Sequence, residues 1–401
     1  MTVAPPVTGR RQRWFTCTPV AFGGGADFFA RDSGLMCRGF QAIGCESMAV
    51  MPGPPQDGDE ASLIRTDFAN LQSAAWWRSL DLDGVVLYAW GSPKFRKVAA
   101  AIHDAGIFLV LNQDNGGFIS PLAGFRGWLE EQRILSDSGS GFLKRVARGL
   151  AGLAVTDPPR ASHLAQGDVI ACVSPAAAER YRTLCRFYGG SALANRVVMI
   201  PHPVESGFHP GSPTEKIRQV ACVGRWQDEL QKRPALMQDV IQPLVTGDAD
   251  IRVEIAGTIT PGLENWHACL PENQRERVIL RGRLERGPLV DMLRRSQVFY
   301  SPSAFESFGI AAGEALCCGC SVVAGRSPSM AAFEWFVSKD SGRLAEQDDK
   351  AGHLTALRDE LACWSGGGRD ATVISREWSH LLHEHEVAAR VLGLRDEQGP
   401  A

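Results

Sequence analysis

One stretch of the chain, residues 301–324, limits the possible folds more than any other. It reads SPSAFESFGIAAGEALCCGCSVVA and comes directly after an apolar run at 298–300. Small residues fill its middle, Gly319 follows them, and a second apolar run begins at Val322. Glycine is common just past the end of a helix. The stretch therefore predicts a strand, a loop, a helix that begins near Gly309 and ends at Gly319, and a second strand.

The start of this predicted helix can bind an anion, because a helix N-terminus presents N–H groups and positive partial charge. Small residues beside Gly309 let an anion approach the backbone. Glu306 precedes the helix and Glu314 lies within it. The helix rise separates the two acids by roughly 8–12 Å, too far to share one phosphate. The carboxylates are suited to hydroxyls on either side of it, a sugar at one end and a ribose at the other.

Composition excludes several classes of protein. The 401 residues suffice for two or three domains, and 44% hydrophobic and 22% charged residues are typical of a globular chain. The net charge of −3 gives no basis for nucleic-acid binding, and no apolar run is long enough to span a membrane. Residues 1–12 are expected to be disordered and do not resemble a signal peptide. The eleven scattered cysteines favour a reducing cytosol.

Strands and helices alternate through the first half. Strands are predicted at 13–20, 47–51, 83–90 and 107–111, with helices at 63–80 and 93–105, which indicates a doubly wound α/β domain. Between the first strand and a helix, Gly24 and Gly25 form a turn that can approach a phosphate or be only a turn. Trp76 and Trp77 are interpreted as packing residues.

Polar residues follow the fourth strand as Asn112-Gln113-Asp114. The carboxyl ends of parallel strands form the ligand crevice, so Asp114 is a candidate for orienting or deprotonating an acceptor hydroxyl. An Asx turn is the alternative.

Residues 142–155 predict an amphipathic helix that carries Lys144, Arg145 and Arg148. A surface helix packed on its own domain is the favoured interpretation. Contact with a membrane surface or an anionic acceptor is the alternative.

In the second half, a strand at 220–223 runs into Gly224 and Arg225, and Lys232 follows at the next helix. Two cations at one strand end can neutralise a diphosphate, and Arg233 competes for that role. A helix is predicted from 378 to 392, and its histidines at 380, 383 and 385 lack the spacing of a metal site. The C-x-x-C at Cys317 and Cys320 is interpreted as packing, with a metal or redox role as the alternative.

Together these segments resemble the donor site of retaining GT-B glycosyltransferases, glycosyltransferase family four (glycosyl transferases group 1). The family pattern contains P-S-x-x-E-[GS]-F-G, then E-A, C-G and V-V, and residues 302–323 carry these segments in this order, with four residues between Gly309 and Glu314. The resemblance implies that Glu306 binds donor-sugar hydroxyls and Glu314 the nucleotide ribose. It also implies that the backbone at Phe308, Gly309 and Ile310 binds the pyrophosphate.

Further roles are implied by the same resemblance. Arg225 and Lys232, after Gly224, neutralise the leaving diphosphate without a metal, and no other cofactor is expected. The loop at Gly24 and Gly25 faces the donor. The loop that contains Arg283 lies against the base.

The implied fold is α/β, GT-B, with two facing Rossmann-like domains and a cleft between them. Residues 1–204 form the acceptor-side domain and 205–375 the donor domain, with a helix at 376–394 packing back on the first. The implied enzyme is a cytoplasmic, metal-independent hexosyltransferase. It moves a hexose-type sugar from a nucleotide-diphosphate sugar to a hydroxyl of a saccharide, lipid-linked or small-molecule acceptor, with retention.

The chain departs from the family at two places. The family often has histidine where this chain has Gln113, and Asn-Gly where it has His202-Pro203. The resemblance therefore implies no role for Gln113 or for His202-Pro203. Two alternatives stay open. One is a degenerate, nucleotide-sugar-binding partner subunit, and the other is a different GT-B enzyme such as a sugar-nucleotide epimerase or a phosphorylase.

Overall fold

The computed structural model describes residues 10–136, 138–211 and 216–398. Residues 1–9, expected to be disordered, lie outside this range. The chain divides into two compact units: residues 1–112, 162–170 and 384–401 form the first, and 113–161 with 171–383 the second. The domain boundaries implied by the resemblance stay a prediction.

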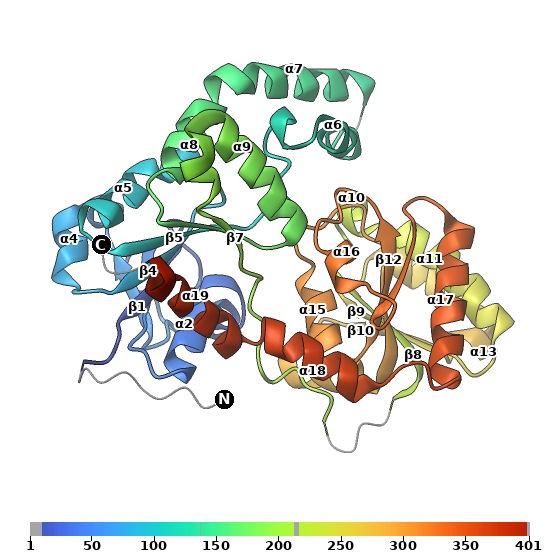
Figure 1. Cartoon of the computed structure of the whole chain (residues 1–401). Helices are drawn as coiled ribbons and strands as arrows, with labels where there is room; N and C mark the ends of the chain where they lie inside the picture. The colour runs from blue at the N-terminus through green and yellow to red at the C-terminus, as the bar shows by residue number, and fades with distance from the viewer. Residues whose placement is uncertain (1–9, 137, 212–215, 399–401) are drawn as a thin grey trace. The chain divides into compact units, whose positions relative to one another are not determined.

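The first sheet is parallel and has seven strands in the order β3-β2-β1-β4-β5-β6-β7 (Figure 1). Its strands are β1 Trp14–Cys17, β2 Ala49–Pro52, β3 Leu63–Thr66, β4 Gly84–Tyr88, β5 Phe108–Gln113, β6 Val169–Cys172 and β7 Val197–Met199. The helices among and after them are α1 Ala26–Phe29, α2 Asp32–Ala42, α3 Phe68–Leu71, α4 Ala74–Ser79, α5 Arg96–Asp104, α6 Phe125–Ile134, α7 Gly139–Val155, α8 Asp157–Leu164, α9 Pro175–Ala194 and the C-terminal α19 Glu384–Gln398. Two 3₁₀ helices span Pro93–Phe95 and Pro121–Ala123.

Tight packing around Trp14 fixes the centre of this sheet. Trp14 is fully buried, and a Cβ at Gly84 on the neighbouring strand would lie 2.5 Å from its ring. Glycine at this position therefore allows β1 and β4 to pair beneath a tryptophan. Trp77 is also fully buried, as expected for a packing residue.

Two expected helices are wrong in part. Residues 63–66 form β3, which pairs in parallel with β2, instead of opening a helix over 63–80. Arg65 is held there by the Asp59 carboxylate, with nitrogen–oxygen distances of 2.6 and 2.8 Å. Pairing with β2 and the ion pair with Asp59 thus decide the backbone, which local periodicity does not report.

The second error concerns the helix expected over 378–392. The structure has α18 Ala371–Leu382 and α19, with a break at His383. Val204 N–H donates to the Leu382 carbonyl at 2.7 Å, and the His383 ring lies 3.0 Å from the Phe208 carbonyl. Val204 therefore occupies the Leu382 carbonyl, which a continuous helix would use for its own hydrogen bond, and Phe208 holds the His383 ring. Beyond the break, α19 packs against α2 within the first unit.

The second sheet is parallel and has six strands in the order β10-β9-β8-β11-β12-β13. Its strands are β8 Ile217–Gly224, β9 Arg252–Gly257, β10 Val278–Gly282, β11 Ser296–Ser301, β12 Ser321–Arg326 and β13 Gly342–Glu346. Its helices are α10 Glu229–Lys232, α11 Pro234–Gly247, α12 Pro261–Ala268, α13 Glu272–Arg275, α14 Arg286–Arg295, α15 Ile310–Cys317, α16 Phe333–Phe336, α17 Lys350–Ser365 and α18.

Both faces of the six-stranded sheet are covered (Figure 1). Along β11, Val298 and Tyr300 pack into the core beneath α11 and α17, whereas Phe299 points to the opposite core beneath α15 and α18. Alternate residues of a strand face opposite sides, so a strand covered on both sides is apolar throughout. The unit is a doubly wound α/β domain, as predicted.

Candidate functional site

Strand order indicates where a candidate site lies in the second unit. The chain proceeds from β8 to β9 and β10 on one side, then crosses to β11 on the other side of β8. In such sheets ligands bind at the carboxyl ends of the two strands where the order reverses. Those ends are Gly224, which leads to Arg225, and Ser301, which leads to the loop at 302–309.

Helix α15 begins as the sequence predicts. Gly309 is its N-cap with φ 84°, and a Cβ there would lie 2.7 Å from the Phe333 ring. Glycine is therefore required both for the left-handed backbone and for the close contact. The N–H groups of Ile310 and Ala311 have no partner within the helix because of its geometry. The helix start is thus built to receive an anion.

Glu306 lies at the centre of a polar network in front of this helix. Its side chain is 11% exposed, and it forms an ion pair with the Lys232 ammonium. Ser303 Oγ donates to Glu306 Oε1 at 2.9 Å, and the Gln231 amide donates to Oε2 at 3.2 Å. The two residues predicted separately for sugar and diphosphate are therefore direct neighbours.

Arg225 joins the same network from the end of β8. Its guanidinium donates to the Gln231 side-chain oxygen at 3.1 Å, and its side chain is 68% exposed. Arg233, the competing cation, instead pairs with Asp348 at 2.6 Å and donates to the Gln347 carbonyl. The structure thus directs Arg225 and Lys232 toward Glu306 and Arg233 away from it.

Glu314 is buried and paired with a residue that sequence analysis missed. Arg286, at the start of α14, donates to Glu314 at 2.8 Å and pairs with Glu205 at 2.9 Å. Its guanidinium also lies 5.0 Å from the centre of the Phe208 ring. Arg286 and Gln231 belong to none of the motifs, and no spacing signal identifies either of them.

The remaining predicted residues lie in different surroundings. Arg283 is exposed in the loop after β10. Gly24, in the first unit, has a packing reason of its own, because a Cβ there would lie 2.2 Å from Leu63 and 2.4 Å from Asp59. The neighbouring Gly25 is the N-cap of α1. The donor roles assigned to these three residues stay predictions.

Asp114 follows β5 and meets a residue to which the sequence assigned no role. Its Oδ1 lies 2.7 Å from His202 Nε2 and 3.5 Å from Ser307 Oγ. Ser307 directly follows Glu306 in the loop before α15. Within the second unit, the structure thus brings Asp114 and His202 to the loop that precedes α15.

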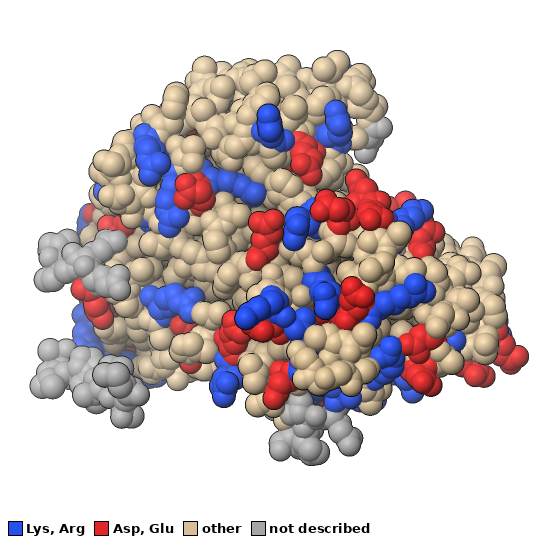
Figure 2. Space-filling view, turned by 45° about the vertical axis from the view of Figure 1, so that its right-hand side comes forward, with Lys and Arg blue, Asp and Glu red and all other residues tan. Residues whose placement is uncertain are grey.

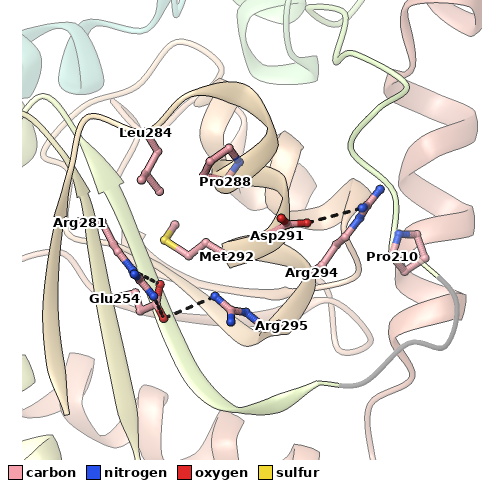
Figure 3. Close-up of a pocket in the computed structure, with 10 residues that line it drawn as sticks. Pro210, Glu254, Arg281, Leu284, Pro288, Asp291, Met292, Arg294 and Arg295 are labelled. Carbon is pink, nitrogen blue, oxygen red and sulfur yellow. Dashed lines mark hydrogen bonds and ion pairs between the residues drawn. The ribbon is translucent and has the colours of Figure 1, made fainter. Parts of the chain in front are cut away.

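A cavity of about 550 Å³ lies elsewhere, along β9, β10 and α14 (Figure 3). The fully buried Glu254 pairs there with Arg281 at 2.7 Å and with Arg295 at 3.9 Å. None of the predicted donor residues is among those that line it. Its polar groups are already paired with one another, and no sequence motif points to it.

Surface charge agrees with the composition. On the face in Figure 2, acidic and basic side chains are interspersed rather than gathered by sign.

Helix α7 has an outward apolar stripe in which Leu143 is 67% and Leu150 46% exposed. Among the described helices, none has the length and apolar character that crossing a membrane requires. All eleven cysteines are free thiols.

Several solved structures share this fold. The lipopolysaccharide outer core galactosyltransferase WaaB, in its apo form, is 13% identical with a TM-score of 0.63, covering 96% of this chain and 100% of its own. Sucrose-phosphate synthase from Thermosynechococcus elongatus is 16% identical with a TM-score of 0.60, covering 97% and 99%. HepE from Anabaena, in complex with UDP and glucose, is 14% identical with a TM-score of 0.58, covering 96% and 99%.

Sequence comparison matches one part of the second unit to a known family. No curated protein sequence matches the chain significantly. Residues 217–362 match the family model of the glycosyl transferases group 1, and this range contains Arg225, Lys232, Glu306 and Glu314. The chain therefore has the GT-B fold of glycosyltransferases and carries, over residues 217–362, the domain of the glycosyl transferases group 1 family.

Proposed function

We propose that this chain is a retaining glycosyltransferase that moves a hexose-type sugar from a nucleotide-diphosphate sugar to an acceptor hydroxyl. The observation that carries the proposal is the network of Arg225, Gln231, Lys232 and Glu306 at the start of α15, where the strand order reverses. It combines anion-binding groups with a carboxylate suited to sugar hydroxyls.

Departure of the nucleotide diphosphate requires charge compensation. Arg225 and the start of α15 supply it, together with Lys232. The Lys232 ammonium has three N–H donors, so it can hold Glu306 and a phosphate oxygen at the same time. These groups support a reaction without a metal ion, in which stabilisation of the leaving group is the largest contribution.

The two acids take different parts of the donor. Glu306, beside the cations, accepts hydrogen bonds from the sugar hydroxyls. Glu314, held by Arg286, accepts them from the ribose. The structures of HepE with UDP, and with UDP and glucose, support a uridine nucleotide as the first donor to test.

Donor binding and hydrolysis test this proposal directly. UDP-, GDP- and ADP-sugars are compared with and without EDTA, by calorimetry for binding and by release of nucleotide diphosphate for turnover. Binding of one donor with slow, EDTA-resistant release is the expected result. Binding without turnover, even with a panel of acceptors, would favour a partner subunit. If no donor binds, the assignment of Glu306 and Glu314 is wrong.

We further propose that α7 contacts a membrane surface during transfer to a lipid-linked acceptor, at the cytoplasmic side. The exposed Leu143 and Leu150 lie beside Lys144 and Arg148, which are also exposed. Such a helix binds anionic lipid by its apolar stripe and positive charge. Free thiols at all cysteines support a reducing compartment.

Flotation with anionic phosphatidylglycerol vesicles tests this contact. Leu143→Glu combined with Leu150→Glu should abolish flotation, because the substitutions charge the apolar stripe. Val373→Glu is the control, since Val373 is 44% exposed on α18, a different helix. Equal flotation of both variants would exclude α7 as the contact.

A further inference from the structure

We propose that His202 is a positioning residue for sugar transfer: it holds the Asp114 carboxylate so that Asp114 orients the acceptor hydroxyl. The inference deepens the proposed transferase function and rests on it. His202 follows β7 and Asp114 follows β5, so the pair is formed by the fold across 88 positions of sequence.

The contact between the two side chains shows which ring nitrogen of His202 carries a hydrogen. His202 Nε2 lies 2.7 Å from Asp114 Oδ1. An ionised carboxylate only accepts hydrogen bonds, so Nε2 carries the hydrogen and donates it. A hydrogen bond to a charged group is among the stronger ones, and it fixes the direction of the carboxylate.

Surrounding groups hold both partners in place. The His202 ring packs edge-on against Phe308, with ring centres 5.4 Å apart, and is flanked in sequence by Pro201 and Pro203. Proline restricts the backbone on both sides. Next to Asp114, the Asn115 amide donates to the Tyr181 hydroxyl at 2.8 Å. The carboxylate is thus placed by groups that have little freedom.

Exposure separates the roles of the pair. The His202 side chain is 2% exposed, whereas that of Asp114 is 27% exposed. A substrate can therefore reach the carboxylate but not the imidazole. Ser307 Oγ, 3.5 Å from the same Asp114 oxygen, is at the limit of hydrogen bonding and contributes less.

The proposed step balances without further reactants. The acceptor oxygen forms a bond to the anomeric carbon while the bond from that carbon to the diphosphate oxygen breaks. The acceptor proton passes to the leaving diphosphate. Asp114 accepts a hydrogen bond from the hydroxyl beforehand and stays ionised throughout, so its contribution is orientation.

Three variants of the full chain test this role. His202→Ala removes the N–H donor, His202→Gln keeps an amide N–H near the position of Nε2, and Asp114→Asn removes the charge. His267→Ala is the matched control, because His267 Nε2 also donates to an oxygen, the Val278 carbonyl, at 2.6 Å, but on α12. Each variant is measured for donor affinity, transfer rate, acceptor KM and thermal unfolding.

We expect His202→Ala and Asp114→Asn to lose about 10²-fold in transfer, the typical cost of misplaced reacting groups. Donor affinity should stay at the wild-type value, and His202→Gln should restore most of the transfer rate. His267→Ala should transfer normally. The inference is wrong if His202→Ala transfers at the wild-type rate, or if Gln and Ala at this position lose transfer and stability equally. A wild-type protein that binds no donor contradicts the proposed function itself, before any variant is compared.

Discussion

At the scale of single residues, the candidate site is a set of charges that pair with one another. Glu306 pairs with Lys232, and Glu314 pairs with Arg286. Each acid is mostly buried, so leaving either without a partner would be costly. In the proposed function a donor shares these partners, and the two acids contact different parts of it.

Replacing the two acids by glutamine should affect different quantities. Glu306→Gln should lower turnover, and Glu314→Gln should weaken nucleotide binding, because in the proposed function the first acid binds the sugar and the second the ribose. Each substitution removes hydrogen bonds to a charged acceptor, which are worth about 1.5–3 kcal/mol. This corresponds to a loss of roughly 10–150-fold in the turnover or the nucleotide affinity concerned. Nucleotide affinity by calorimetry and initial rates of transfer are measured for both. Negligible effects of both variants would contradict the assignment.

Two neighbouring arginines provide the test of charge compensation. Arg225→Ala should lower turnover on the order of 10²–10³-fold, by analogy with the loss of an oxyanion donor. Arg233→Gly should not, because the Arg233 guanidinium is held by Asp348. Glycine is chosen because Arg233 has φ 50°, a left-handed conformation that glycine adopts without strain. A larger loss from Arg233→Gly than from Arg225→Ala would reverse the assignment of the two cations.

At the scale of elements, α15 begins and ends where the sequence predicts. Its start depends on Gly309, whose conformation and contact with Phe333 exclude a side chain. Gly262, in the first turn of α12, meets only Thr260 Oγ1, at 3.8 Å, and is an ordinary helical glycine. Both glycines lie at the start of a helix, but only Gly262 has room for a side chain.

Alanine substitutions should separate them. Gly309→Ala should lower the free energy of unfolding by about 1–3 kcal/mol, the cost of a strained backbone. Gly262→Ala should leave it unchanged or raise it by about 0.4–1 kcal/mol, because alanine lowers the entropy of the unfolded chain. Urea unfolding followed by circular dichroism measures both. Equal stability of the two variants would show that the start of α15 tolerates a side chain.

At the scale of the molecule, one half-buried acid should make stability depend on pH. Burial raises the pKa of Glu131, on α6, from 4.5 to about 7, and the positive charges of Arg180 and Arg145 oppose this increase. The folded chain thus binds this proton more tightly than the unfolded chain does. The contribution to stability is fully present below pH 4.5 and is lost as the pH rises through about 7.

Glu131→Gln should remove this pH dependence. Between pH 5 and 8 the wild-type protein should lose roughly 2–3 kcal/mol relative to the variant, the value of a shift of this size. Glutamine has the same shape and no proton to release. Chemical unfolding at several pH values measures the difference. Parallel pH profiles of the two proteins would show that another group is responsible.

Much of the architecture follows from sequence because the signals are local. These signals are the continuous apolar runs of the strands, the glycine at each end of α15 and the short spacing from Arg225 to Lys232. The candidate donor residues were chosen from these local signals, and the structure places two of them, Glu306 and Lys232, side by side although 74 positions separate them. Local patterns predict that such residues share a sheet edge, since carboxyl ends of parallel strands meet there.

Tertiary structure alone decided the features that depend on contacts between separate segments, because no sequence motif marks the residues that meet. Residues 63–66 became a strand through pairing with β2, and the break at His383 follows from contacts with Val204 and Phe208. The pairing of Asp114 with His202 depends on the segments after β5 and β7, which are separated in the sheet by β6 and come together only in the fold. Sequence determined which residues carry charge and where elements begin, and packing determined which of those charges meet.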